Sequence, residues 1–208
     1  MRPRGVAQRT RRSAAAVRVT RAGLLTRSLA MLGALGGSAA AAAELGASPA
    51  SQPSPARDRQ ILRFGLLIER IQAAFYAEAL RAGRLTAENR QLAEIVGKEE
   101  QAHVRYMAAA LGSSAGRAPR FRFGDAVTDP AKFVATAVSL EDTGLAVYNG
   151  QGANLTPAAL AGTARLVSVE ARHAAWARAL AGELPAPVAV DVPVTLTQAN
   201  AILRPFLA

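Results

Sequence analysis

Six residues of this 208-residue chain have the types and the spacing to bind metal ions. They comprise the two histidines of the chain, the glutamate that lies three positions before each histidine, and two lone glutamates. The six residues are Glu69, Glu100, His103, Glu141, Glu170 and His173. On a helix, side chains three positions apart lie on one face about one turn apart, so each Glu-x-x-His pair can serve one metal region. Because the chain has no cysteine, carboxylate and imidazole are the available ligands, and they favour iron, manganese or zinc.

The order of these residues repeats within the chain. Glu69 lies 31 positions before Glu100, and Glu141 lies 29 positions before Glu170. Taken singly, each of the six is more often structural than a ligand, but the shared Glu-x-x-His spacing of both histidines favours a common site. A lone Glu on each of two helices and a Glu-x-x-His on each of the other two is similar to the ligand pattern of di-iron and di-manganese four-helix bundles. We therefore predict two metal ions, with iron expected and manganese as the alternative.

A tyrosine follows each lone glutamate by seven positions, as Tyr76 and Tyr148. Both are candidate catalytic residues that would contact a metal ligand or relay a radical. Packing with a hydrogen bond is the structural alternative. Glu99 precedes a predicted ligand but points to a different side of its helix, so we expect it to be solvated.

Apolar residues at spacings of three and four predict the helices that must position these ligands. Asp129-Pro130 and Thr156-Pro157 are start signals for two of them, because an N-cap acceptor followed by proline suits the first helical turn. The four predicted helices cover residues 58–82, 86–111, 130–149 and 157–181.

The connections between these helices predict the topology. The first pair and the second pair are joined by short segments, so each pair is predicted to be antiparallel. Residues 113–128 join the second helix to the third, and when extended they reach about 53 Å. A helix of about 25 residues is only about 37 Å long, so this segment can run the full height of the bundle. The prediction is an all-α, ferritin-like four-helix bundle with one long crossover.

The formal net charge of +10 is concentrated at the start of the chain. Residues 1–59 contain ten arginines against two acidic residues, whereas residues 60–208 contain fifteen basic and thirteen acidic residues. No predicted face interleaves aromatic with basic side chains, so we exclude nucleic acid as a partner.

Residues 1–43 have the layout of an export signal, with a basic stretch, an apolar run and small residues at its end. The pair Arg11-Arg12 makes the twin-arginine route a candidate. An organellar transit peptide and an uncleaved membrane anchor are the alternatives. We predict a periplasmic or secreted protein that has no permanent membrane span after the signal is cleaved.

Four segments therefore divide the chain. They are the export signal (1–43), a flexible linker (44–58), the four-helix bundle (59–182) and a C-terminal extension with a short helix at 197–203 (183–208).

These motifs together resemble the bacterial ferritin-like domain family that also includes the plant desiccation-related proteins. The resemblance covers about residues 60–181 and is carried by residues 68–76, 100–103, 140–144, 148–150 and 169–173. It implies a four-helix fold and a di-metal site, but it does not decide the activity. Relatives often have a second glutamate where this chain has Gln72, and this difference removes an additional carboxylate.

The predicted function is that of an exported di-iron protein that oxidises Fe(II) or reduces oxygen or peroxide, with a role in stress protection. Metal ions and oxygen or peroxide are its expected partners, and a homodimer is a candidate assembly. The first alternative is a stress-related structural or binding protein whose metals only stabilise the bundle. The second is a manganese catalase-like protein, because the same ligands accept manganese.

Overall fold

The computed structural model describes residues 52–208, so the predicted export signal and most of the predicted linker lie outside it. Within this part of the chain, the helices are α3 (Pro55–Ala82), α4 (Ala87–Leu111), α5 (Pro130–Gln151), α6 (Pro157–Leu180) and α7 (Leu196–Leu203). The 3-10 turns are Gly112–Ala115, Gly124–Val127, Gly152–Asn154 and Arg204–Phe206. No helix in the described residues is long and apolar enough to cross a membrane.

Side-chain caps begin the helices. Asp129 and Thr156 accept backbone N–H groups in the first turns of α5 and α6, as their sequence signals predict. The same kind of signal, Ser54 followed by Pro55, begins α3 three residues earlier than predicted. Residues 55–58 are consequently helical, and this end of the predicted flexible linker is corrected.

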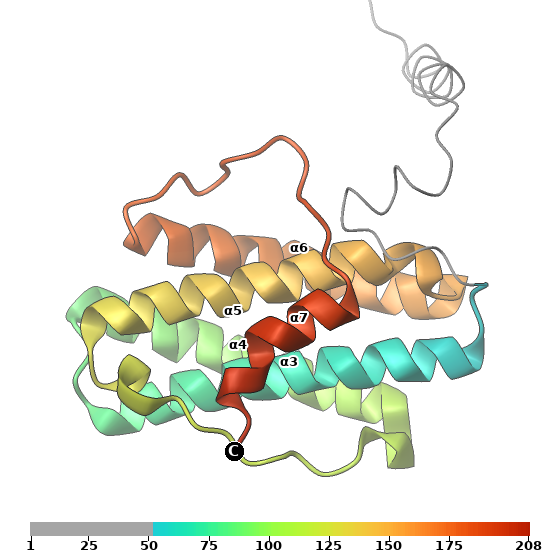
Figure 1. Cartoon of the computed structure of the whole chain (residues 1–208), viewed down its shortest axis with the longest axis horizontal. Coiled ribbons are helices and arrows are strands. Elements are labelled where there is room, and N and C mark those ends of the chain that lie inside the picture. The colour runs from blue at the N-terminus through green and yellow to red at the C-terminus, as the bar shows by residue number, and fades with distance from the viewer. Residues whose placement is uncertain (1–51) are drawn as a thin grey trace, which may run out of the picture. The chain divides into compact units, whose positions relative to one another are not determined.

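The four long helices form a bundle with one crossover (Figure 1). Short connections make α3 antiparallel to α4 and α5 antiparallel to α6, whereas the segment between α4 and α5 runs the length of the bundle and makes these two helices parallel. Arg63 and Arg70 fasten the start of this segment by donating to the backbone carbonyls of Ser114, Ala115 and Gly116. The all-α bundle with a single long crossover is thus confirmed.

The C-terminal extension packs on the outside of the bundle. Its helix α7 lies across α3 and α5 in Figure 1 and buries Ala199 and Leu203 in the core. After α7, Leu207 pairs with Phe121 in an isolated antiparallel bridge. The extension therefore connects the crossover to α5, and it contains the short helix that the sequence predicts.

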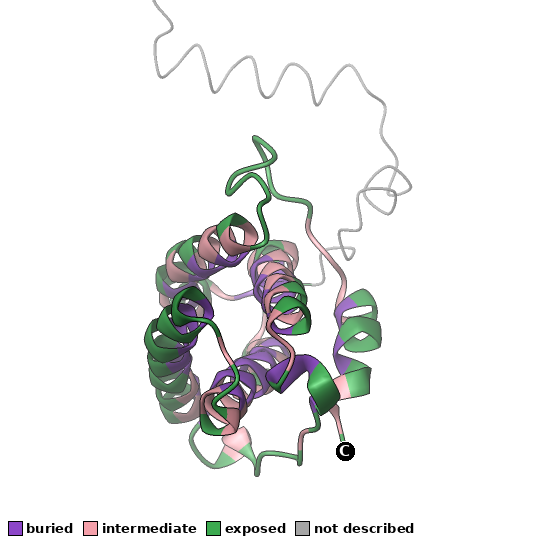
Figure 2. Ribbon diagram, turned by 90° about the vertical axis from the view of Figure 1, so that its left-hand side faces the viewer, coloured by how far each residue is buried: buried purple, intermediate pink, exposed green. Residues whose placement is uncertain are grey.

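Two apolar clusters occupy the bundle interior, and the buried faces of the helices turn toward it (Figure 2). In the larger cluster Phe75 stacks on Phe133, with ring centroids 5.1 Å apart, and meets the edge of Phe123 at 5.4 Å. The smaller cluster surrounds Met107 and Leu166. The predicted ligands lie between the two clusters along the helices, so apolar packing closes their layer at both ends.

Two glycines let α3 and α4 pack closely, and alanine at each should have a different effect. A Cβ at Gly97 would lie 2.8 Å from the Cβ of Tyr76, close to the backbone of α3. We expect Gly97→Ala to lower the free energy of unfolding by about 1–3 kcal/mol through overpacking. At Gly65 the nearest atom is the Cε of Met107, the flexible end of a side chain, so Gly65→Ala should cost little and gain helix propensity. Thermal unfolding of both variants checks this, and equal effects would contradict it.

Candidate metal centre

The bundle brings all six predicted ligand residues into one buried layer. Glu69 comes from α3 and Glu141 from α5, and a Glu-x-x-His pair comes from each of α4 and α6. All four glutamates are fully buried, and the histidines are only 6% and 3% exposed. A carboxylate at such depth is costly unless it is paired, so four of them in one layer require compensating cations or protons.

The ligand atoms of this layer form two overlapping groups. In each group, one atom from each of four residues lies within 4.8 Å of the others. The first group is Glu69, Glu100, His103 and Glu170, and the second is Glu100, Glu141, Glu170 and His173. Two glutamates, Glu100 and Glu170, belong to both groups. Each group adds one further glutamate and one histidine of its own.

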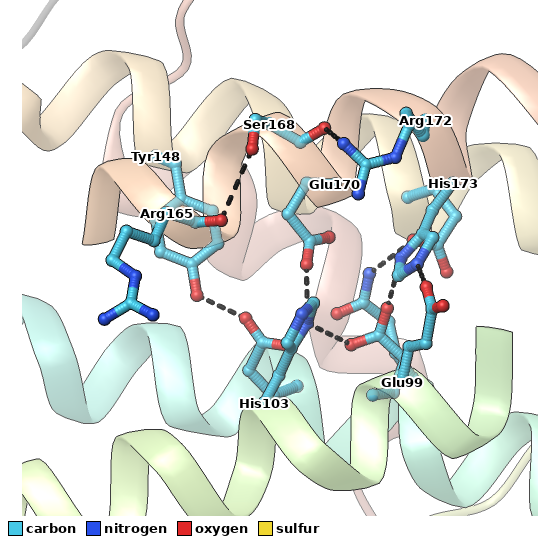
Figure 3. A network of polar contacts seen from close by, with 12 residues as sticks. Glu99, His103, Tyr148, Arg165, Ser168, Glu170, Arg172 and His173 are labelled. Carbon is cyan, nitrogen blue, oxygen red and sulfur yellow. Dashed lines mark hydrogen bonds and ion pairs between the residues drawn. The ribbon is translucent and has the colours of Figure 1, made fainter. Parts of the chain in front are cut away.

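The Nδ1 atoms of both histidines face the carboxylates (Figure 3). His103 Nδ1 lies 3.2 Å from Glu69, 3.3 Å from Glu100 and 2.9 Å from Glu170. His173 Nδ1 lies 2.7 Å from the other oxygen of Glu100. Nδ1 is therefore the nitrogen that each imidazole presents to the layer.

Each predicted tyrosine contacts the lone glutamate of the opposite half of the bundle. The Tyr76 hydroxyl donates to Glu141 at 2.7 Å, and the Tyr148 hydroxyl donates to Glu69. Burial and nearby carboxylates raise the pKa of both phenols well above the ordinary value, so both hydroxyls keep their protons and act as donors. The tyrosine and the glutamate that are seven residues apart on one helix therefore do not pair with each other; each pairs with its counterpart on the other helix, α3 or α5.

Gln72 is fully buried beside the layer. Its amide donates to Glu141 at 3.1 Å and to the Leu140 carbonyl at 3.5 Å. A Cβ at Gly144 would lie 3.2 Å from this amide nitrogen and 3.4 Å from Glu170. Gln72 is therefore a neutral donor that orients a predicted ligand, Glu141. It packs closely against α5 at Gly144, where there is no side chain.

Glu99 is not simply solvated, which corrects the sequence expectation. Its carboxylate lies 2.6 Å from the Nε2 of His173, although its side chain remains 48% exposed (Figure 3). Helical position alone missed this contact because the partner histidine comes from a different helix, α6, 74 residues along the chain. The acidic residue immediately before a Glu-x-x-His pair is the signal that could have indicated it.

Comparison with known proteins agrees with this architecture. The sequence model of the family described as ferritin-like domain matches residues 57–183, which is more than half of the chain. The chain belongs to the ferritin-like domain family. No curated protein matches it. The matched residues of this ferritin-like domain include all four long helices from residue 57 onward, and with them the entire buried layer.

The carboxylates of the ferritin-like layer favour protonation in the absence of a cation. Burial and the charge of Glu170 raise the pKa of Glu141 to about 8. Burial and the charges of Glu69 and Glu100 raise the pKa of Glu170 to about 8. The pKa of Glu100 also lies well above its ordinary value because of burial and the charges of Glu69 and Glu141. These protons must leave before the oxygens can bind a metal ion.

His103 and Glu69 form the charged pair of the layer. Burial lowers the pKa of His103, but hydrogen bonds to Glu100, Glu170 and Glu69 outweigh burial and raise it to about 12. Burial likewise raises the pKa of Glu69, but its hydrogen bonds to His103 and Glu100 outweigh burial and lower the pKa overall. The imidazolium thus takes the place that a cation would take among the carboxylates.

The remaining unsatisfied atoms show what the layer can bind. Within the described residues, Glu170 Oε2 is buried without a hydrogen-bond partner, whereas Glu100 Oε1 and Glu170 Oε1 lie 2.7 Å and 2.9 Å, respectively, from a histidine Nδ1. Native proteins rarely leave such atoms unpaired. Carboxylate oxygens that converge with an imidazole nitrogen are the environment that a divalent cation satisfies, so this buried group could hold a metal ion.

Proposed function

We propose that this ferritin-like domain holds two metal ions, of which iron is the expected element, and oxidises Fe(II) or reduces oxygen or peroxide in stress protection. The observation that carries the proposal is the pair of overlapping ligand groups that share Glu100 and Glu170. Bound iron would supply one-electron chemistry between its Fe(II) and Fe(III) states. The residues of the chain bind, orient and neutralise it.

Charge supports a site with two ions. Four ionised carboxylates carry four negative charges, which balance two divalent cations, whereas a single divalent ion would leave two buried charges uncompensated. Each histidine belongs to only one group, so each ion would have one neutral imidazole ligand. The two tyrosine hydroxyls would keep Glu69 and Glu141 in position from the outside.

Metal analysis followed by rapid kinetics tests the proposal. The protein would be purified from cells supplied with iron, its metal content measured, and the Fe(II) form mixed with oxygen or with peroxide in a stopped-flow spectrometer. We expect two irons per chain and fast oxidation. A protein that binds no metal would contradict the proposal, and manganese in place of iron, with peroxide breakdown, would favour a catalase-like protein.

Burial of the layer favours one alternative, in which the metals only stabilise the bundle. All six ligand residues are buried in the interior of the bundle. A cleft of about 380 Å³ between α5 and α6 is lined in part by Tyr148, which donates to Glu69. Two bound metals without any oxidation of the Fe(II) form would support this structural role.

Tyr148 is therefore the side chain to test for a part in turnover. It lies between the cleft and Glu69, and we expect Tyr148→Phe to keep two metals but to change the oxidation rate by about 10-fold or more, as the loss of an outer contact to a ligand commonly does. Tyr106→Phe is the matched control, because Tyr106 is 40% exposed and its hydroxyl donates to the backbone carbonyl of Gly162 on α6. Stopped-flow measurements compare the oxidation rates of both variants. Equal rates would show that Tyr148 has no part in turnover.

Export of the domain is a further part of the proposal, and it rests on the basic and apolar layout of residues 1–43. If the twin-arginine route is used, the bundle folds and takes up its metal in the cytoplasm before export. Replacing both Arg11 and Arg12 by lysine should then retain the protein in the cytoplasm, as cell fractionation would show. Unchanged export of this variant would argue against that route.

A further inference from the structure

The two halves of the ligand layer are not equivalent. In the first half, the residue before the Glu-x-x-His pair is Glu99, whereas in the second half it is Val169. The carboxylate of Glu99 reaches across from α4 to α6 and lies 2.6 Å from the Nε2 of His173. Valine has no group that could form the corresponding contact with His103.

The histidines consequently differ in what holds them. The ring of His173 has a carboxylate on each side, with Glu100 2.7 Å from Nδ1 and Glu99 2.6 Å from Nε2 (Figure 3). The carboxylate contacts of His103 in the described residues all involve Nδ1. The rings are otherwise similar, since both are almost fully buried and their centroids are 5.8 Å apart.

A carboxylate that accepts the Nε2 proton has two effects on an imidazole. It selects the tautomer in which Nδ1 carries the free lone pair. It also restricts the rotation of the ring, so less ordering is needed when Nδ1 binds a cation. Both effects strengthen metal binding by His173 and are absent at His103.

We propose that Glu99 is a positioning residue for His173 and makes the metal position beside His173 the tighter of the two. The inference rests on the proposed function, because it assumes that the layer holds two ions. It goes beyond that function in assigning an order of filling and in naming the residue that sets it.

A stepwise metal titration tests this order. Co(II) would be added to the metal-free protein in competition with a chelating dye, with the Co(II) absorption spectrum recorded at each step. Glu99→Val gives the first half the residue that the second half carries, and Glu99→Gln keeps the shape of the side chain without its charge. Glu94→Gln is the matched control, because Glu94 lies on the same helix and its side chain is 57% exposed in a surface pair with Arg90.

We expect two binding steps in the natural chain and in Glu94→Gln. In Glu99→Val the tighter step should weaken by about 10–100-fold and approach the weaker one. A ¹⁵N spectrum of the imidazoles provides a readout that needs no metal. The resonance of a hydrogen-bonded His173 Nε2–H should shift in Glu99→Val and stay unchanged in Glu94→Gln, whereas His103 should be unaffected in both.

The outcomes separate this inference from the proposed function. If Glu99→Val leaves both binding steps and the His173 resonance unchanged, Glu99 does not position His173. The proposed metal centre would be unaffected by that result. Weakening of both steps by the same factor would also overturn the role of Glu99, because the residue would then act on the whole layer. Failure of the natural chain to bind Co(II) would count against the proposed function itself, and the ¹⁵N spectrum would still decide whether Glu99 holds His173.

Discussion

Replacing Glu100 by alanine is expected to remove both metal ions from the protein. Glu100 is fully buried and belongs to both ligand groups, so its loss removes one of the two shared carboxylates from each proposed metal position. Glu69 belongs to only one group, so Glu69→Ala should weaken the binding of one ion much more than the binding of the other. Metal analysis of the purified variants after exposure to excess iron measures both effects.

The stability of the metal-free protein shows whether a variant loses its metal only because it is unfolded. Burial and neighbouring charges raise the pKa of Glu100 well above its ordinary value, so this carboxyl does not stabilise the metal-free fold as a charge. Metal-free Glu100→Ala loses the packing of a buried side chain, so its thermal unfolding must show that the variant is still folded before its metal content is compared. Glu94→Ala, at the surface of the same helix, should keep both metals. Two ions retained in folded Glu100→Ala would contradict the assignment of the shared carboxylate.

The stability of the metal-free bundle is expected to fall as the pH rises from about 5 to about 8. Glu141 and Glu170 have a pKa of about 8 in the folded protein against 4.5 ordinarily, so between these values the folded chain binds more protons than the unfolded chain. The free energy of unfolding therefore decreases with pH in this window. The contribution of His103, complete below pH 6.5, is lost as the pH rises toward its folded pKa of about 12, and so acts in the same direction.

The size of this effect is measurable by calorimetry. Each pKa unit of difference amounts to about 1.4 kcal/mol, which corresponds to a Tm lower by about 3–6 °C in a domain of this length. The metal-loaded protein should show the opposite slope, because metal binding needs the deprotonated ligands. Exchanging both Glu141 and Glu170 for glutamine should flatten the metal-free profile. A metal-free Tm that rises over this range would show that the layer does not hold its protons.

The sequence alone was sufficient to predict the bundle and the six residues of the layer. Both depend on local information, since caps such as Asp129-Pro130 begin helices and a three-residue spacing places Glu and His on one helical face. The length of the crossover determined the topology, because only a long segment can return along the whole bundle (Figure 1). The start of α3 was misplaced because the cap at Ser54 lies within a stretch rich in proline and serine.

Only the tertiary structure decided which residues support these ligands. Tyr76 pairs with Glu141 and Gln72 donates to that same carboxylate, although each lies on α3 beside Glu69 in the sequence. Glu99 contacts a histidine that is 74 residues away. Such contacts depend on the distance and rotation between two packed helices, which helical periodicity does not specify. Spacing within one helix therefore predicts which residues form the layer, whereas packing between helices determines which side chains contact them.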